Sequence, residues 1–254
     1  MGHKKPIIQK NRLQAVCLVL VFSHSAIFTF SWYNNIVKFI GKQRKLGWRA
    51  KTLQYRIKES VIMLVPQEER QYTYADYLSW PEDERVEIID GVLYMQATPS
   101  PEHQEISMNL STQISVYLKG KPCKVYAAPF SVRLTKGDEK KDEDIKKVFE
   151  PDITVVCDKS KIDKQGCKGI PDLIIEIISP SSIKLDRVTK FNQYENAGVI
   201  EYWIVEPEGK IVSVFLLQSN GRYGRPEIYT EEEKITVSIF PDLTVDLSTV
   251  FPSI

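Results

Sequence analysis

Two carboxylates lie where the surrounding sequence is apolar. Asp152 opens the apolar run 153–157, and Glu176 stands inside a second run, 173–178, whose other residues are all Leu or Ile. An ionised carboxylate in a buried strand is costly unless it is paired or binds a metal ion. Glu176 is therefore the most informative residue of the sequence, and the two acids are candidates for a site that holds a cation.

The elements that must position these acids follow from hydrophobic periodicity and turn residues. Apolar residues at four-residue spacing predict a helix over 103–118, and a second helix is expected over 183–197 with Gly198 as its C-cap. Asp90-Gly91 between two β-rich runs predicts a hairpin. A short helix is expected within 72–78, a charged solvated loop at 136–147, strands at 124–128, 131–134, 148–157, 173–178, 201–205 and 211–217, and edge strands within 233–239 and 243–247. This order predicts an α/β fold in which the two acids lie on central strands.

Charge divides the chain into two unequal parts. Residues 1–62 contain 12 Lys and Arg against Glu59 alone, a formal charge of +11, whereas residues 63–254 contain 22 basic and 32 acidic residues, a charge of −10. We therefore expect a basic N-terminal extension, 1–62, and a folded domain, 63–254. Cysteines at 17, 123, 157 and 167 show neither zinc-ligand spacing nor a disulfide framework, which favours a reducing compartment and a buried thiol at Cys157.

The extension allows three interpretations. Residues 15–33 are uncharged over a length that could cross a bilayer, which makes them a candidate membrane anchor. Basic residues on both sides give this segment no clear orientation, and a cleaved signal peptide is disfavoured because basic residues continue beyond it. The third interpretation is that translation begins at Met63. The protein is then expected in the cytoplasm, with a membrane-anchored protein as the alternative.

Several motifs in series resemble a known group of proteins. Pro151-Asp152 and the later Glu176 resemble the acidic half of the PD-(D/E)xK nuclease superfamily, although the usual lysine two residues after the second acid is Ile178 here. The wider pattern is similar to the Uma-two family of bacterial endonucleases, over roughly residues 72–251. The motifs that carry this resemblance are Arg85-x-Glu87-x-x-Asp90-Gly91, Pro99-x-Pro101-x-His103, Pro151-Asp152, Pro171-Asp172-Leu-x-x-Glu176-x-x-Ser179-Pro180-Ser181, Asp186-x-x-x-Lys190 and Tyr194-x-x-x-Gly198-x-x-Glu201-Tyr202-Trp203.

The resemblance implies a restriction-endonuclease-like fold: a mixed central sheet flanked by helices, with an N-terminal hairpin and C-terminal edge strands. It implies a nuclease whose Asp152 and Glu176 bind Mg²⁺, or Mn²⁺, with the carbonyl of Ile177 as a third ligand. The metal would make its water more acidic and neutralise charge on the phosphate. In this family the lysine is displaced onto the following helix, the place of Lys190, which would stabilise the reacting phosphate.

Alternatives remain for each of these residues. Lys190 could be an ordinary surface partner of Asp186, four residues earlier on the same helix. His103 and Glu87 could contact the substrate or hold a water molecule, or be structural. Ser179-Pro180-Ser181 is better explained as a cap and turn than as a nucleophile.

The expected binding partner is nucleic acid, and DNA in the first place. A homodimer is also expected, as in enzymes that cut both strands of a duplex. A membrane is a partner only if residues 15–33 are an anchor. The −10 charge argues against broad adhesion to DNA, although a local basic cleft holding Lys184, Arg187 and Lys190 stays open. The alternative function is an inactive nucleic-acid- or protein-binding module with the nuclease fold.

Overall fold

The computed structural model describes residues 70–81 and 85–252, which fall within a compact unit spanning Pro66–Ile254. The basic extension 1–62, its apolar segment 15–33 and the alternative start at Met63 lie outside the described residues. Within the described ranges, no helix combines the length and apolar character needed to cross a bilayer.

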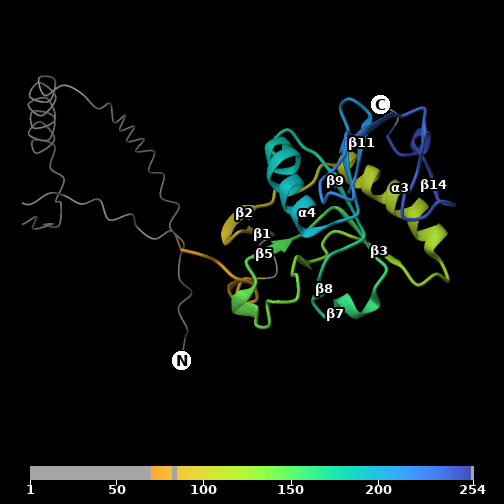
Figure 1. Cartoon of the computed structure of the whole chain (residues 1–254). Helices are drawn as coiled ribbons and strands as arrows, with labels where there is room; N and C mark the ends of the chain where they lie inside the picture. Colours follow the sequence, from red (N-terminus) through yellow and green to blue (C-terminus); the bar gives the residue numbers. More distant parts are fainter. Residues whose placement is uncertain (1–69, 82–84, 253–254) are drawn as a thin grey trace, which may run out of the picture. The chain divides into compact units, whose positions relative to one another are not determined.

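The described chain is a mixed α/β structure, as the sequence predicts (Figure 1). Its helices are α2 (Tyr74–Tyr77), α3 (Pro101–Leu118) and α4 (Phe191–Ala197), the last continuing from a π-helical segment at Leu185–Lys190. The strands are β1 (Val86–Ile89), β2 (Val92–Met95), β3 (Lys124–Ala127), β4 (Val132–Arg133), β5 (Lys147–Phe149), β6 (Ile153–Val156), β7 (Ile162–Asp163), β8 (Gly166–Lys168), β9 (Leu173–Ile177), β10 (Glu201–Glu206), β11 (Ile211–Leu216), β12 (Glu227–Thr230), β13 (Lys234–Thr236) and β14 (Thr244–Asp246).

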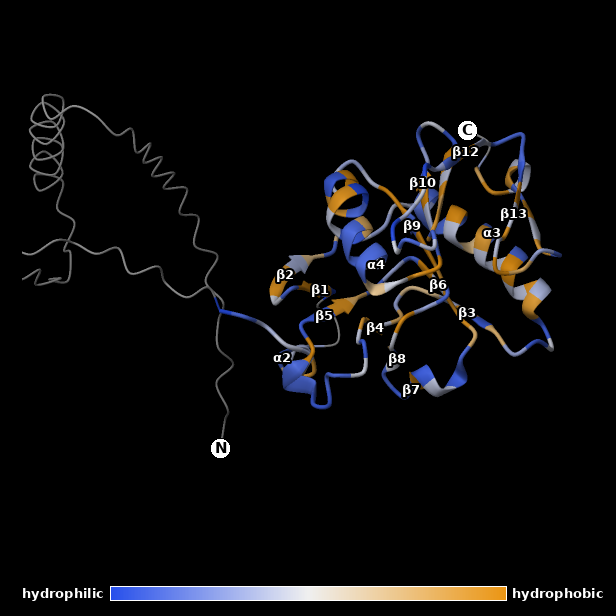
Figure 2. Cartoon of the chain, in the orientation of Figure 1, coloured by the Kyte–Doolittle hydropathy of each residue, from blue (hydrophilic) through white to orange (hydrophobic). Residues whose placement is uncertain are grey.

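A central six-stranded sheet carries both acids that the sequence singles out. Its order is β12-β11-β10-β9-β6-β3, and only β9 and β10 run parallel, joined by the crossover through α4. Side chains alternate between its faces: Ile175 and Ile177 of β9 pack in the same core as α3, whereas Ile174 and Ile178 pack with Tyr194 of α4. Helices α3 and α4 therefore cover opposite faces of the central sheet. Its strands β6 and β9, and β5 of the second sheet, are largely apolar (Figure 2).

A second six-stranded sheet, with the order β2-β1-β5-β4-β8-β7, packs against the α4 side of the central sheet. Its β1–β2 hairpin confirms the predicted turn, because Asp90 and Gly91 both adopt positive φ angles of 51° and 80°. Strands β7 and β8 were not expected from the sequence. The predicted helix stop is also confirmed, since Gly198 caps α4 in the left-handed conformation with φ of 100°.

Two sequence-based expectations about strands are wrong. The run 148–157 forms two strands in different sheets, β5 and β6, because Pro151 has no N–H for a strand ladder. The two C-terminal strands pair with each other against α3 instead of extending the central sheet, whose edge on that side is β12. The charged loop 136–147 is largely exposed, as expected, apart from Ile145, which is 1% exposed and packs in a core with Tyr74.

The cysteines also differ from expectation. Cys123 and Cys157 form a disulfide that links the ends of the neighbouring strands β3 and β6. The antiparallel register pairs Lys124 with Val156, so the two cysteines face each other one residue further along. Cys157 is therefore not the free buried thiol that its apolar surroundings suggested; that description fits Cys167.

Candidate active site at the end of the central sheet

Asp152 and Glu176 lie at the same end of the central sheet. Ile153, the first residue of β6, pairs with Ile175 of β9, so Asp152 just before β6 and Glu176 just after Ile175 are brought to one end of these neighbouring strands, and both line the same cleft. The backbone N–H of Ile177 donates to Oδ2 of Asp152 at 2.8 Å, which orients this carboxylate at the end of β9.

The first turn of α3 brings His103 to Asp152. Ser100 caps this helix by accepting a hydrogen bond from the backbone N–H of His103, and Pro101 occupies the first helical position. The Nε2 atom of His103 lies 3.2 Å from Oδ2 of Asp152. Burial disfavours the charged imidazole, but the hydrogen bond and the charge of Asp152 outweigh burial and raise the pKa of His103. The structure thus places His103 as a partner of Asp152.

Glu176 is almost completely buried, with 3% of its surface exposed. Its Oε1 accepts hydrogen bonds from Lys190 Nζ at 3.0 Å and from the Tyr194 hydroxyl at 2.7 Å. Burial raises the pKa of Glu176 well above 4.5, although the ammonium of Lys190 works in the opposite direction. Because the hydrogen bonds within the described chain use Oε1, the second oxygen of Glu176 is left for another partner.

Lys190 lies among three carboxylates. Its Nζ is 3.0 Å from Oε1 of Glu87, 3.0 Å from Oε1 of Glu176 and 3.5 Å from Oδ1 of Asp186. Burial disfavours the ammonium, but these acids, Glu176 first, outweigh it and raise the pKa of Lys190. Only 5% of the lysine side chain is exposed, so the alternative of a surface pair with Asp186 is wrong. We refer to Glu87, Glu176 and Asp186 as the carboxylate cage.

Glu87 connects the hairpin sheet to this cage. It is fully buried on β1, and its Oε1 accepts a hydrogen bond from the backbone N–H of Glu150 at 2.9 Å besides contacting Lys190. Its Oε2 is buried and has no hydrogen-bond partner among the described residues. A buried carboxylate oxygen without a partner is costly, and it marks a place where a water molecule or a cation would be stabilised.

The acids open onto a cleft of about 1130 Å³. Its walls come from the ends of β1, β2 and β9, the start of α3 and the β10–β11 turn, and it is lined by Arg85, His103, Asp152, Glu176, Ser179 and Lys210 among others. This volume is far larger than a single ion requires and resembles that of large ligand-binding clefts. Ile178, two residues after Glu176, packs in the core and is 8% exposed, whereas Lys190 contacts Glu87, Glu176 and Asp186.

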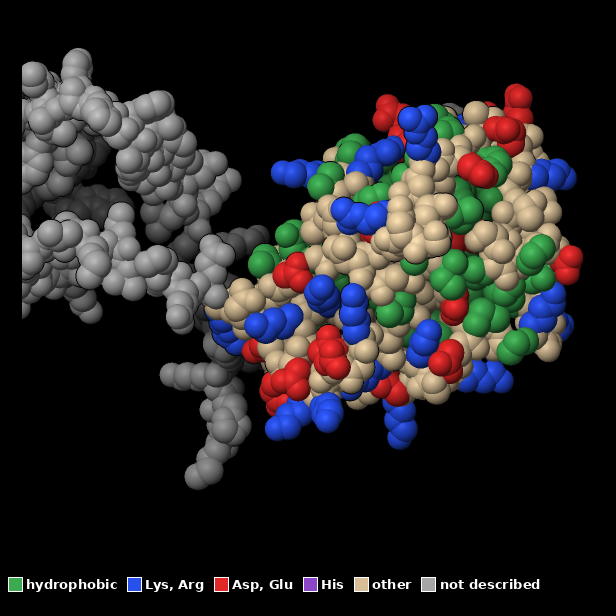
Figure 3. Space-filling view, in the orientation of Figure 1, with side chains coloured by type: hydrophobic (Ala, Val, Ile, Leu, Met, Phe, Trp, Pro, Cys, Tyr) green, Lys and Arg blue, Asp and Glu red, His purple; other side chains and the backbone are tan. Residues whose placement is uncertain are grey.

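The local basic cleft suggested by the sequence is not observed. Arg187 pairs with Glu206, and Lys184 is exposed and does not line the cleft. Basic side chains of the cleft itself are also paired: Arg85 with Glu150 at 3.2 Å and Lys210 with Glu231 at 2.6 Å. On the face shown in Figure 3, basic and acidic side chains are interspersed.

The donor set fits one hard divalent cation. Among residues 70–81 and 85–252 there is no group of three or more His, Cys, Asp or Glu side chains arranged as a ready-made metal site. Asp152 and Glu176 nevertheless offer two carboxylates that line the same cleft, and Glu87 adds a buried oxygen without a partner among the described residues. Mg²⁺ is commonly held by one or two carboxylates and keeps several water molecules, so a two-carboxylate site suits it.

All five residues selected from the sequence line this one cleft: Glu87, His103, Asp152, Glu176 and Lys190. Sequence reasoning missed two contributions. Asp186 and Tyr194 share the helical face of Lys190 at four-residue spacing, but nothing local showed that this face is buried.

The loop Ser179-Pro180-Ser181 after β9 forms the expected turn, closed by the backbone N–H of Ser182 donating to the carbonyl of Ser179, but the expected side-chain cap is not found at the helical segment that follows. The backbone N–H of Ser179 donates to Oγ of Ser182, and the carbonyl of Ser182 accepts a hydrogen bond from the backbone N–H of Asp186. The imidazole of His103 contacts Asp152 and not the serine hydroxyls of this loop. The structure thus gives this loop a helix-starting role.

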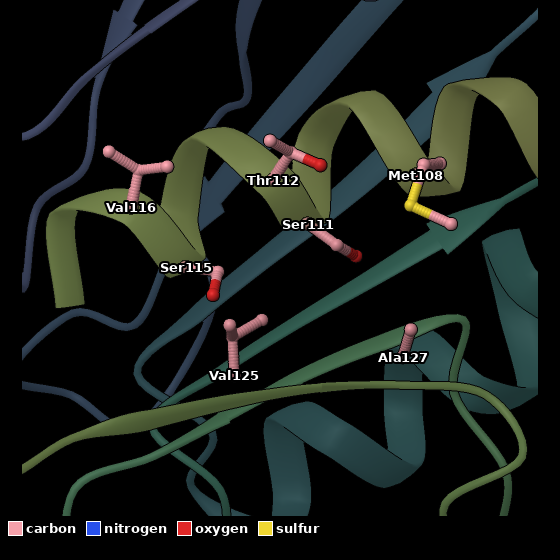
Figure 4. Close-up of a pocket in the computed structure, with 7 residues that line it drawn as sticks. All are labelled: Met108, Ser111, Thr112, Ser115, Val116, Val125 and Ala127. Atoms are coloured by element: carbon pink, nitrogen blue, oxygen red, sulfur yellow. The ribbon is translucent and has the colours of Figure 1, made fainter. Parts of the chain in front are cut away.

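A second, smaller hollow lies between α3 and β3 (Figure 4). It has a volume of about 280 Å³, and Ser115 of the helix lies above Val125 of the strand. Its lining contains hydroxyl, thioether and aliphatic side chains but no acid or base: Met108, Ser111, Thr112, Ser115, Val116, Val125 and Ala127. The chemistry therefore belongs to the larger cleft.

Comparisons with known proteins bear on the family and the fold. The family model Uma2, described as "Putative restriction endonuclease", matches residues 74–248. Two uncharacterized proteins of Synechocystis sp. are similar: slr1290 is 28% identical over 134 residues, 51% of this chain and 65% of the relative, and sll1609 is 22% identical over 147 residues, 56% of this chain and 78% of the relative. The chain thus spans just under two thirds of the first relative.

A crystal structure described as a putative nuclease belonging to DUF820, from Anabaena variabilis, superposes with a TM-score of 0.54. The sequence identity is 21%, and the match covers 71% of this chain and 97% of that chain. At this identity the likeness establishes the fold, which is the nuclease-like α/β fold expected from the sequence.

Proposed function

The chain belongs to the Uma2 family, described as putative restriction endonucleases, and from this premise we propose that it is an endonuclease that hydrolyses phosphodiester bonds of nucleic acid, DNA in the first place, with Mg²⁺ or Mn²⁺. The observation that carries the proposal is the placement of Glu176: a buried carboxylate that lines the same cleft as Asp152 and has one oxygen held by Lys190 and Tyr194. A purely structural role does not explain a carboxylate that is buried yet faces a cleft.

In this proposal Asp152 and Glu176 hold the metal ion. When bound, a divalent cation would neutralise charge on the phosphate and make a coordinated water more acidic. Asp152 is oriented for this task by the Ile177 N–H and by His103. Glu176 is oriented by Tyr194 and Lys190, whose bonds to one oxygen direct the other away from the helix.

Lys190 supplies a fixed positive charge beside the reacting phosphate. Its ammonium is almost completely shielded from bulk water, so its field is less screened than that of a surface lysine. A preorganised charge of this kind stabilises negative charge that develops in the transition state without reorganisation of the protein. His103 acts on the metal ligand Asp152, and Glu87 acts on Lys190.

The test is a cleavage assay on single- and double-stranded DNA and RNA with Mg²⁺ or Mn²⁺, run beside a metal-binding measurement. Glu176→Gln keeps the side-chain volume and should abolish both cleavage and the stabilisation of the fold by metal. Glu105→Gln, an exposed acid on α3, is the matched control and should behave as the parent. Cleavage by Glu176→Gln at the parent rate would refute the assignment.

The same assay addresses the alternative function. A chain that binds metal and nucleic acid but cleaves none of the four substrates would be a binding module with the nuclease fold. We also propose that the protein acts as a homodimer. Measuring the mass of the protein in solution, with and without duplex DNA, tests this.

A further inference from the structure

The cage around Lys190 has the composition of a cation site. Three carboxylates contribute one oxygen each at 3.0, 3.0 and 3.5 Å from Nζ. All three acids are nearly or completely buried: Glu87 is 0%, Glu176 3% and Asp186 3% exposed. Carboxylates packed together with so little water would repel one another strongly if ionised, so a cation at this position is stabilising.

The lysine provides this cation: its ammonium donates a hydrogen bond to Glu176 and forms ion pairs with Glu87 and Asp186. An ammonium carries three N–H donors, and three carboxylate oxygens surround this one. Lys190 is therefore engaged by the protein before any substrate arrives. Its contribution is a permanent charge at a fixed position.

Glu176 joins this cage to the proposed metal site. One oxygen contacts Lys190 and Tyr194, and the other remains for the ion shared with Asp152. In two-metal nucleases and phosphatases the two ions lie about 3.5–4 Å apart and clamp the attacking and leaving oxygens. A carboxylate that serves one cation through each oxygen is the arrangement expected between two such positions.

We propose that Lys190 permanently occupies the second cation position, so that the chain binds a single divalent ion, and that Glu87, Glu176 and Asp186 form a latent metal site that the lysine fills. Independent support comes from Glu87, whose Oε2 is completely buried and lacks a hydrogen-bond partner among the described residues. This inference rests on the proposed function, because it takes Asp152 and Glu176 as the ligands of the first ion.

Metal stoichiometry tests the proposal without reference to activity. The full chain, freed of metal, is titrated with Mn²⁺ in a calorimeter, and bound metal is counted independently by elemental analysis after gel filtration. The parent should bind one Mn²⁺ per chain. Lys190→Met, which keeps the length of the side chain and removes its charge, should bind two. Adding Glu87→Gln to Lys190→Met should return the count to one, because the latent site then loses a charged ligand.

The controls separate this inference from the function on which it rests. Lys184→Met removes an exposed lysine of the same helix and should leave the count at one. A parent that binds two ions overturns the inference and leaves the nuclease proposal intact, whereas a parent that binds none overturns both. A Lys190→Met chain that folds and still binds one ion also overturns it; if that variant does not fold, the parent count alone decides.

Discussion

The Tyr194 hydroxyl offers the sharpest test of how the site is oriented. Its O–H donates to Oε1 of Glu176 at 2.7 Å, and both groups are buried. A hydrogen bond to a charged group contributes about 1.5–3 kcal/mol, and loss of a partner that orients a metal ligand typically weakens metal binding about 10- to 100-fold. Tyr194→Phe should therefore raise the Kd for Mn²⁺ by about 10- to 100-fold.

The fold should tolerate this change. The phenyl ring can keep the packing of the tyrosine ring against Phe149 and Tyr202, whose centroids lie 5.3 and 5.1 Å away. Lys190 also continues to donate to the same oxygen, which limits the loss. The assay is calorimetric titration with Mn²⁺, combined with thermal unfolding in the absence of metal to measure stability separately.

Tyr223→Phe is the matched control. Tyr223 packs in the same aromatic cluster, but its hydroxyl donates to the carbonyl of Val199 rather than to a carboxylate of the site. It should lose stability to a similar extent and bind Mn²⁺ as the parent does. Equal Mn²⁺ affinities for Tyr194→Phe and the parent would refute the view that this hydroxyl prepares Glu176 for the metal.

Three further predictions follow from the charges and cross-links of the domain. Because burial raises the pKa of Glu176 well above 4.5, protons should compete with Mn²⁺ for this carboxylate at a higher pH than they do at an ordinary one. Mn²⁺ titrations over a pH series should therefore show an affinity for Mn²⁺ that rises with pH, and an affinity independent of pH would contradict this. Reduction of the Cys123–Cys157 disulfide, which closes a loop of 34 residues, should lower the free energy of unfolding by about 4 kcal/mol according to the chain-entropy relation. Denaturant unfolding with and without dithiothreitol measures this difference, and coincident unfolding curves would show that the disulfide is absent. A chain beginning at Met63 should unfold cooperatively, and aggregation cured only by restoring residues 1–62 would show that the fold needs the extension. Because the basic side chains of the cleft are paired and leave few phosphate contacts, a plot of the logarithm of its DNA-binding constant against the logarithm of the salt concentration should have a slope shallower than about −5. A steeper slope would show that DNA binds to a basic face outside the cleft.

The acid pair could be predicted from the sequence because its signal is local. A single Glu inside five Leu and Ile residues is anomalous in itself, and the structure indeed buries Glu176 in β9. The hairpin and the two long helices were predictable for the same reason, since turn residues and apolar spacing act over a few positions. The two-sheet arrangement was not, because it depends on the break at Pro151 and on strands that are distant in the sequence.

Lys190 shows where local patterns fail. Four-residue spacing places Asp186, Lys190 and Tyr194 on one helical face but does not say which face is inside. The usual rule puts charged residues outside, and here it is reversed: the charged face is buried, whereas Ile183 and Val188 are 46% and 50% exposed. The reason lies in partners far away in sequence, Glu87 on the hairpin and Glu176 on β9.

Burial of a carboxylate does not by itself identify a reactive one, and Glu201 shows the difference. It is as buried as Glu87, yet its Oε1 accepts from the Trp203 indole and its Oε2 from the backbone N–H and hydroxyl of Ser238. Both oxygens are thus satisfied, and the acid ties the C-terminal segment to the central sheet. Glu176 has its hydrogen bonds on one oxygen only and lines the cleft. Replacing a buried ion pair with apolar residues can raise the free energy of unfolding by about 1–4 kcal/mol. A cluster of buried charges in which one carboxylate oxygen lacks a partner is therefore better explained by a role in binding or catalysis than by a contribution to stability.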